Sequence, residues 1–150
     1  MEEECYYGMF AGCTSLATVP SNMLSATTLA NGCYQFMFYG CTSLTAAPNL
    51  PVTELEDGCY NHMFEGCTSL TTAPELPATT LAYNCYAYMF SGCTSLSGIT
   101  CLATDISAEF CTDEWVDGVA ASGTFTKAAS MTDWETGISG IPSGWNVVNA

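Results

Sequence analysis

The apolar positions of this chain recur at a fixed spacing. The frame Cys-Tyr-x-x-Met-Phe-x-Gly-Cys-Thr-Ser-Leu starts at Cys5, Cys33, Cys59 and Cys85, with equal later intervals and a slightly longer first one. A period of about 26 residues is typical of a solenoid, in which each unit buries its apolar face only by stacking on its neighbours. The pattern therefore predicts a stack of similar coils.

Some positions of the repeat stay constant and others vary. The constant ones are Cys, Met, Phe, Gly, Cys, Leu, Pro and Leu, and we expect them in the interior, where volume is tightly specified. The variable ones, which we expect outside, are the pair after Tyr and the residue before Gly: Tyr7-Gly8, Gln35-Phe36, Asn61-His62 and Ala87-Tyr88, with Ala11, Tyr39, Glu65 and Ser91.

Each repeat also carries signals for local structure. Cys and Met at i and i+4 predict a short helix of one or two turns, which would stop in a left-handed cap at Gly12, Gly40, Gly66 and Gly92. Thr-Ser-Leu-Thr after that glycine predicts a short strand. The prolines then force an extended return segment (Pro48, Pro51, Pro74 and Pro77). The predicted fold class is an α/β repeat solenoid, a leucine-rich-repeat coil with one short parallel strand and one short helix or turn per repeat.

The combination Phe-x-Gly-Cys-Thr-Ser-Leu followed by Leu-Pro closely resembles the BspA-like leucine-rich repeats of bacterial surface proteins. The resemblance covers residues 5–110, with four copies of the frame. The unit here has about 26 residues rather than about 23, and a second Cys stands where the family usually has an aliphatic residue. The resemblance implies an open solenoid displayed outside the cell and linked to adhesion or host-protein binding. It implies no particular ligand.

The C-terminal part differs from the rest. Residues 111–119 are a degraded fifth copy, in which Trp115 replaces Met and Val119 replaces the second Cys. Terminal repeats are atypical because they seal the core, and Trp134 and Trp145 are suited to plug it. We therefore expect a four-repeat solenoid over residues 1–110, followed by a degenerate fifth repeat plus a C-terminal cap over residues 111–150.

At the other end the chain enters the first motif directly after Glu4. Because an exposed ladder end is an unpaired edge, we expect the protein to continue upstream, to self-associate or to pack on a partner there. The first loop, residues 19–26, is two residues longer than its counterparts. We interpret it as a tolerated surface insertion rather than a recognition loop.

The strongly negative net charge limits the classes of partner that this chain can bind. Fifteen acidic residues face a single lysine, Lys127, giving a formal net charge of −14, which argues against nucleic-acid binding and against anionic membrane surfaces. No apolar run is long enough to span a bilayer, so no membrane insertion is expected. The first residues lack the basic and apolar regions of a signal peptide. The predicted location is extracellular or at the cell surface, with the virion as the alternative.

Ten cysteines allow two interpretations. They are either small buried apolar residues of the core or one disulfide per repeat, which would favour an exported protein. A straight helix holds residues eight apart at about 12 Å, too far to bridge, but a helix that turns back at the glycine brings them closer. The candidate pairs are Cys5–Cys13, Cys33–Cys41, Cys59–Cys67, Cys85–Cys93 and Cys101–Cys111. A zinc site is disfavoured because the chain has no Cys-x2-Cys knuckle and one histidine, His62.

No catalytic constellation stands out. His62 occupies a variable position and is interpreted as an exposed bystander, and the acidic residues are scattered over outer turns. Asp113, Glu114 and Asp117 cluster without matching a calcium loop, and no phosphate-binding glycine loop is present. We therefore predict no enzyme activity and no cofactor.

The predicted function is a non-catalytic, surface-displayed binding or adhesion module for a protein or glycan. Its candidate ligand-binding residues are variable aromatics and outward strand positions: Phe36, Tyr39, Tyr88, Ser43, Thr45, Ser69, Thr71, Ser95 and Ser97. The alternative is a structural unit of a phage fibre or extracellular filament. Rows of threonine also suggest ice binding, but the period alone repeats such β-prone residues.

Overall fold

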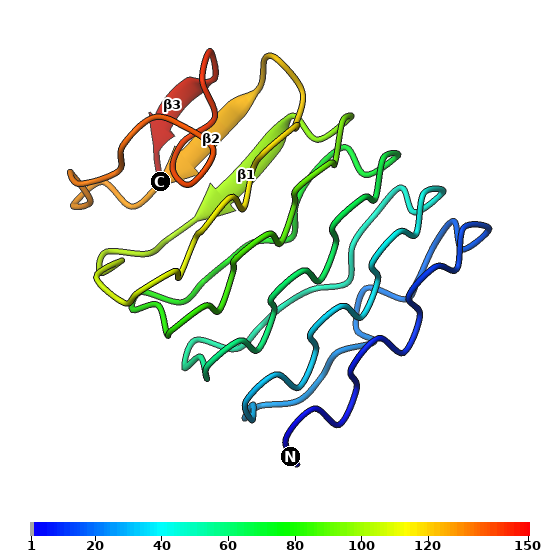
Figure 1. Ribbon diagram of the computed structural model, residues 1–150. Helices are drawn as coiled ribbons and strands as arrows, with labels where there is room; N and C mark the ends of the chain where they lie inside the picture. Colours follow the sequence, from blue (N-terminus) through cyan, green and yellow to red (C-terminus); the bar gives the residue numbers. More distant parts are fainter. Residues whose placement is uncertain (1) are drawn as a thin grey trace.

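The computed structural model of the chain describes residues 2–150. Its strands are β1 (Gly98–Cys101), β2 (Thr124–Lys127) and β3 (Asn146–Asn149), which form a parallel sheet in the order β1-β2-β3. Before β1 the chain winds in loops that stack side by side, and the first loop and β3 lie at opposite ends (Figure 1). We call each stretch from one Cys-Tyr frame to the next a coil.

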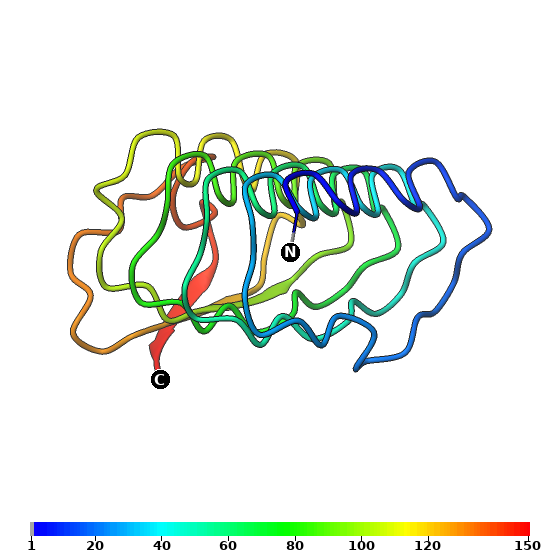
Figure 2. The same cartoon turned by 90° about the horizontal axis from the view of Figure 1, so that it is seen from below.

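The Cys-Tyr-x-x-Met-Phe-x-Gly segment of each coil is a succession of tight turns, which we call the turn ribbon. In the second coil, the N–H of Met37 donates to the carbonyl of Tyr34 within the coil (3.2 Å), whereas the N–H of Phe38 donates to the carbonyl of Met63 in the next coil (2.9 Å). Successive N–H groups therefore point alternately along the ribbon and across the stack. The turn ribbons line one side of the stack and β1–β3 line the opposite side (Figure 2).

The predicted short helix is wrong, because residues 2–150 contain no helical segment. Every fourth residue of the ribbon has a positive φ; in the third coil these are Gly58 (62°), His62 (55°) and Gly66 (73°). A left-handed residue interrupts a right-handed helix, so the chain turns again and again instead of continuing one helix. The left-handed glycines predicted at the helix ends are confirmed, since Gly40 and Gly92 have φ of 67° and 72°.

The predicted strand directly after that glycine is also wrong. Thr42 and Ser43 form a turn, and in the fourth coil the strand begins only at Gly98. Earlier coils are joined on this side by separate hydrogen bonds and bridges rather than by a continuous ladder, such as the N–H of Thr45 donating to the carbonyl of Ala17 (3.1 Å) and the parallel bridge between Thr72 and Gly98. A threonine-rich sequence is β-prone, but the tight turn that ends the ribbon occupies these residues.

Aromatic side chains from successive coils form two columns inside the stack. One column consists of tyrosines closed by a tryptophan: Tyr6, Tyr34, Tyr60, Tyr86 and Trp115. The other consists of phenylalanines: Phe10, Phe38, Phe64 and Phe90. Neighbouring rings lie 5.5–6.3 Å apart and nearly parallel. Such pairs contribute about 0.5–1.5 kcal/mol beyond their burial, so the columns tie each coil to the next.

The constant residues of the repeat fill the rest of this core, as predicted. From the second coil on, the constant Cys, Met, Phe and Leu side chains are buried, as Met37, Cys41 and Leu44 show. One variable position differs from the prediction: Asn61 and Ala87, expected outside, are buried. Asn61 is satisfied there by the side-chain amide of Gln35, which donates to its Oδ1 at 2.7 Å.

The fifth ribbon is covered by the segment 138–140. The N–H of Val116 donates to the carbonyl of Ile138 (3.1 Å), and the indole Nε1–H of Trp115 donates to the carbonyl of Gly140 (2.8 Å). Trp134 stacks on Trp115 with ring centres 5.6 Å apart. This segment therefore supplies the acceptors that a further coil supplies elsewhere in the stack.

The ribbon glycines provide a test of the backbone. Gly66→Ala should lower the free energy of unfolding by about 1 kcal/mol, because an L side chain at φ 73° is strained. The added Cβ would meet only ordinary contacts, at 3.6 Å from the Cα of Gly40, so strain rather than crowding sets the cost. Urea unfolding measures it, and Ser95→Ala on an exposed turn is the neutral control. A neutral Gly66→Ala would contradict the left-handed ribbon.

Candidate binding site

Four aromatic side chains from successive coils stack on the solvent side of the turn ribbons: Tyr7, Phe36, His62 and Tyr88, which we call the outer aromatic row. The His62 ring lies 4.4 Å from that of Phe36 and 4.6 Å from that of Tyr88, with interplanar angles of 10° and 2°. Tyr7 is tilted against Phe36 at 5.4 Å. The row thus crosses the first four coils as one continuous surface.

The row follows from the backbone of the ribbon. Phe36, His62 and Tyr88 occupy the same ribbon position and have φ between 55° and 57°. Coils paired by backbone hydrogen bonds lie about 4.8 Å apart, a distance at which flat rings in equivalent positions stack. The first coil has Gly8 at this position, the residue that fits a left-handed conformation without strain. Bulky side chains here cost conformational energy, which their mutual stacking offsets.

Tyr39 extends this surface sideways. Its ring meets Phe36 edge-on at 5.7 Å and 66°, and the side chain is 42% exposed. In the following coils the same ribbon position holds Glu65 and then Ser91, so the surface beside the row changes from aromatic to polar along the stack.

Acidic groups border the row. The Nδ1 of His62 contacts the carboxylate of Glu65. At the C-terminal end, the carboxylate of Glu114 raises the pKa of the half-buried Tyr88 above its usual value, with smaller contributions from desolvation, Asp113 and Glu65. The negative potential disfavours a phenolate. The same negative potential favours cations beside the rings.

The structure brings the predicted aromatic residues together but distributes the predicted hydroxyls differently. Phe36 contacts Tyr39 directly and reaches Tyr88 through His62. The hydroxyl group of Thr45 donates to the carbonyl of Ala17 at 3.1 Å, so this side chain contributes to coil-to-coil bonding. The other predicted hydroxyl residues are exposed or half-buried: Ser43, Ser69, Thr71, Ser95 and Ser97.

The members of the row that the sequence interpretation missed are Tyr7 and His62. The ring faces of His62 are covered by Phe36 and Tyr88, so this residue is not the exposed bystander that was expected. Aligning the repeats gives the signal, because Phe36, His62 and Tyr88 fall in one column of flat rings. Among residues 2–150, the hydrogen-bond partner of the imidazole is Glu65, with no serine or cysteine hydrogen-bonded to it.

All ten cysteines, which lie within the described residues, are free thiols in the structure. None of the five candidate disulfides is therefore formed. The first and second cysteines of a repeat lie in separate columns. The thiols of the second column donate to a phenylalanine carbonyl of the preceding coil: the thiol of Cys67 donates to the carbonyl of Phe38 (3.1 Å) and that of Cys93 to the carbonyl of Phe64 (3.0 Å). The stack uses these side chains as core residues with a weak hydrogen bond.

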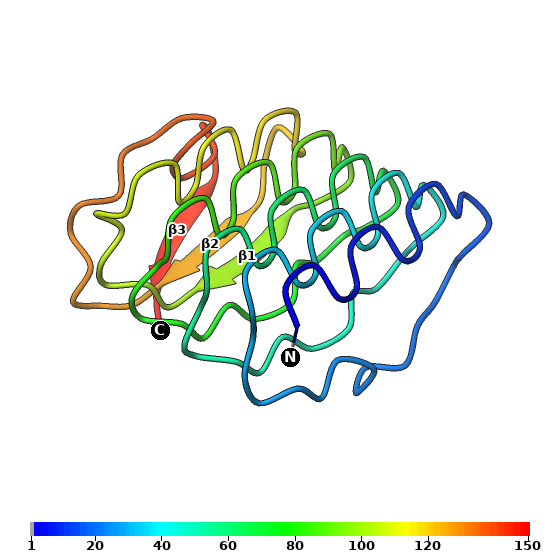
Figure 3. The same cartoon turned by 60° about the horizontal axis from the view of Figure 1, so that its bottom comes forward.

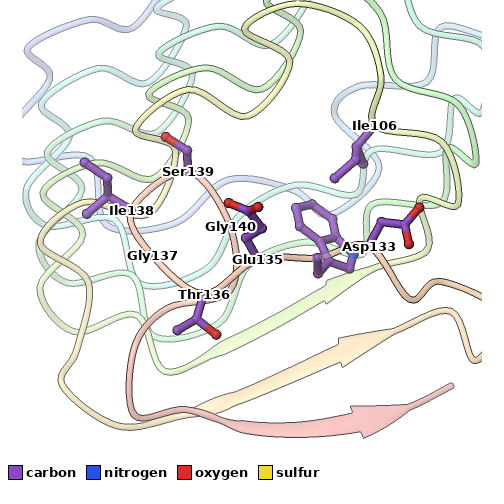
Figure 4. A pocket seen from close by; sticks show the side chains of 9 residues that line it. Ile106, Asp133, Glu135, Thr136, Gly137, Ile138, Ser139 and Gly140 are labelled. Atoms are coloured by element: carbon purple, nitrogen blue, oxygen red, sulfur yellow. The ribbon is translucent and has the colours of Figure 1, made fainter.

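A surface pocket lies beside the segment that covers the fifth ribbon. It has a volume of about 420 Å³ and is lined by Ile106 and by the loop 133–140, including Glu135 and Ser139 (Figure 4). The buried Nε1 of Trp134, which also lines it, has no hydrogen-bond partner within residues 2–150. Over the same residues no three His, Cys, Asp or Glu side chains gather to hold a metal ion, and no helix is long and apolar enough to cross a bilayer.

Comparison with known proteins adds no relative, since no family model, curated protein or solved structure matches this chain.

The thiols give a direct test of this arrangement. Cys5 and Cys13 are exposed and the other eight are buried, so iodoacetamide at pH 8 without reductant should label two cysteines rapidly. The eight buried thiols should react at least tenfold more slowly, since they become accessible only on unfolding. Peptide mass mapping identifies the labelled sites. In 6 M guanidinium all ten should react; fewer than ten would show that disulfides exist and would restore the pairing hypothesis.

Buried thiols also predict how stability depends on pH. Burial raises the pKa of Cys85, Cys93 and Cys101 to about 12 from an ordinary value of 9.0. Above pH 9 the unfolded chain releases these protons while the folded chain keeps them, so stability falls as pH rises. The urea midpoint should be constant from pH 7 to 8.5 and decline between pH 9 and 12. Cys93→Ala should flatten the decline, whereas Ser95→Ala, which removes no titrating group, should leave its slope unchanged.

Proposed function

We propose that this protein is a non-catalytic binding module that recognises a protein partner through the outer aromatic row. The observation that carries the proposal is the stack of Phe36, His62 and Tyr88 on the outside of the ribbons, at left-handed positions where glycine would be free of strain. Strained residues held in place by their surroundings concentrate at functional sites. Aromatic side chains are also enriched where proteins bind one another.

The carboxylates around the outer aromatic row favour a positively charged partner. Glu65 lies against His62, and the field of Glu114 reaches Tyr88, while the chain carries fifteen acidic residues and one lysine. Such a surface steers positively charged partners towards it. Arginine suits it best, because its planar guanidinium group pairs with carboxylates through two parallel hydrogen bonds.

The stacking geometry favours a protein over a glycan. Sugars pack on open ring faces, but both faces of His62 are covered and one face of Tyr88 lies against it. The row therefore presents ring edges, with Tyr39 adding an aromatic side chain that is 42% exposed. Arginine and lysine side chains can bind at such edges through the neighbouring carboxylates.

Surface display follows from the resemblance to BspA-like repeats and remains part of this proposal. Adhesion requires an extended surface rather than a deep cleft, and a stack of coils provides one. The second candidate function is a structural unit of a fibre or filament. The observation that favours it is the exposure of two side chains in the first coil whose equivalents are buried elsewhere: Tyr6 is 39% exposed and Met9 is 51% exposed.

The triple variant Phe36→Gly/Tyr39→Ser/Tyr88→Gly tests the binding proposal with changes that the chain itself uses. Gly8 and Ser91 occupy the equivalent positions in other coils, so the fold and the net charge should be preserved. Fluorescence anisotropy with labelled octa-arginine should show about tenfold weaker binding than for the unchanged chain, a loss of about 1.4 kcal/mol, because the exposed ring of Tyr39 and the ring edges beside Glu65 and Glu114 are removed.

The matched control is Tyr83→Ser/Phe110→Gly, which removes an exposed aromatic pair elsewhere. Phe110 also has a positive φ of 56° and contacts Tyr83 edge-on, so strain and exposed aromatic area change similarly. This variant should bind octa-arginine as the unchanged chain does. Equal loss in both variants would assign binding to general charge, and glycan binding that disappears with the triple variant would assign the row to sugars.

A further inference from the structure

The outer aromatic row has an imidazole near its centre. The ribbons of the second, third and fourth coils lie side by side (Figure 3), and Phe36 and Tyr88 from the outer two of these ribbons cover the faces of the His62 ring at 4.4 and 4.6 Å. A molecule in solvent therefore reaches this ring along its edge. The sequence contains one histidine, so the row has this edge at a single point.

The two nitrogens of the His62 ring have different surroundings. The Nδ1 contacts the carboxylate of Glu65. An ionised carboxylate only accepts hydrogen bonds, so in the neutral imidazole the Nδ1 carries the proton and the Nε2 is left as an acceptor. Within residues 2–150 the Nε2 has no hydrogen-bond partner, and the one buried side-chain nitrogen or oxygen without a partner belongs to Trp134. The Nε2 of His62, whose side chain is 22% exposed, is therefore an unpaired acceptor open to solvent.

Protonation of this imidazole changes both the charge and the hydrogen bonding of the row. The titratable groups that face the imidazole are Glu65 from its own ribbon and the phenol-bearing ring of Tyr88 from the next, while the preceding ribbon contributes the uncharged ring of Phe36. Glu114 and Asp113 face Tyr88 in turn. A neutral imidazole leaves the nearby carboxylate charge unopposed and offers a lone pair to a donor. An imidazolium neutralises that carboxylate and turns the Nε2 into a donor, so a cationic donor is disfavoured on both counts.

We propose that His62 is the acceptor at which the outer aromatic row binds an N–H donor of its cationic partner, and that protonation of this imidazole releases the partner. This role rests on the proposed function and adds regulation to it. An arginine side chain fits, because one N–H of the planar guanidinium donates to the Nε2 while its neighbours reach the carboxylate of Glu65. Histidine is the side chain whose charge changes between pH 5 and 8, so binding is strong at pH 8 and weak at pH 5.5.

The stack itself accommodates the protonated ring. A cation between two aromatic faces is attracted by both, and the carboxylate of Glu65 pairs with an imidazolium at the Nδ1. Acidification to pH 5.5 therefore leaves the row and the fold in place, and the loss of binding comes from the changed edge of His62. Circular dichroism spectra at pH 8 and pH 5.5 should coincide.

His62→Phe tests this role with the residue that the chain itself has at the equivalent position, Phe36, so ring stacking and backbone conformation are kept. Fluorescence anisotropy with labelled octa-arginine should show about tenfold weaker binding by the unchanged chain at pH 5.5 than at pH 8, the effect of one hydrogen bond to a charged group. His62→Phe should bind at pH 8 as weakly as the unchanged chain does at pH 5.5, with the same affinity at both pH values. The control variant Tyr83→Ser/Phe110→Gly retains His62 and should keep the full pH dependence.

A second measurement follows the imidazole directly in the unchanged chain. A partner that binds the neutral ring opposes its protonation by the same factor by which protonation weakens binding. Because the sequence contains one histidine, the imidazole gives a single set of NMR signals. A pH titration of these signals should show that saturating octa-arginine lowers the proton affinity of His62 about tenfold. In the triple variant Phe36→Gly/Tyr39→Ser/Tyr88→Gly, octa-arginine should leave that proton affinity unchanged.

Two results would overturn the role of His62 and leave the row as a binding site. One is parallel pH profiles of binding for the unchanged chain and His62→Phe; the other is a proton affinity of His62 that octa-arginine does not alter in the unchanged chain. Equal binding of octa-arginine by the unchanged chain and the triple variant would instead contradict the proposed function itself, and with it this role.

Discussion

The structure depends on backbone hydrogen bonds that cross from each coil to the next at every second residue of the turn ribbon. These bonds exist because every fourth residue adopts a left-handed conformation, which turns the intervening N–H groups alternately along the ribbon and across the stack. An α-helix of the same sequence would direct all its N–H groups along its own axis and leave neighbouring coils joined by side chains alone. The left-handed positions therefore convert a local turn into a long-range contact.

The columns of side chains follow from the same constraint. Once the backbones of adjacent coils are in register, equivalent residues lie above one another, and a repeated residue type becomes a stack. Inside, this gives the tyrosine and phenylalanine columns with rings 5.5–6.3 Å apart. Outside, it gives the outer aromatic row, where Phe36, His62 and Tyr88 approach within 4.4–4.6 Å. One register thus produces both the core and the candidate binding surface.

The sequence predicted the repeated core well and the local backbone poorly, for physical reasons. The residue types at Met37, Cys41 and Leu44 are the same in all four repeats, and this constancy predicts burial because a packed interior constrains side-chain volume. The Cys-to-Met spacing is compatible with a helix and with the turn ribbon alike, so it could not distinguish them. Only one of the three left-handed positions is always glycine; the others hold residues such as His62 or Asn84, whose positive φ is imposed by neighbouring coils. His62 was missed as a site residue for the same reason, since its role depends on rings one repeat away on either side.

The two ends of the stack show what the polarity of these bonds demands. Each ribbon has an acceptor edge towards the N-terminus and a donor edge towards the C-terminus, so the two ends require different chemistry. At the C-terminal end the chain meets this demand itself, with the carbonyl of Ile138 and the hydroxyl of Ser139 receiving the N–H groups of Val116 and Glu114. In the first coil, the carbonyls of Cys5, Tyr7, Met9 and Ala11 accept no backbone hydrogen bond within residues 2–150. The ribbon geometry therefore leaves acceptors at one edge and donors at the other, and the segment 138–140, which covers the donor edge, accordingly contributes acceptors.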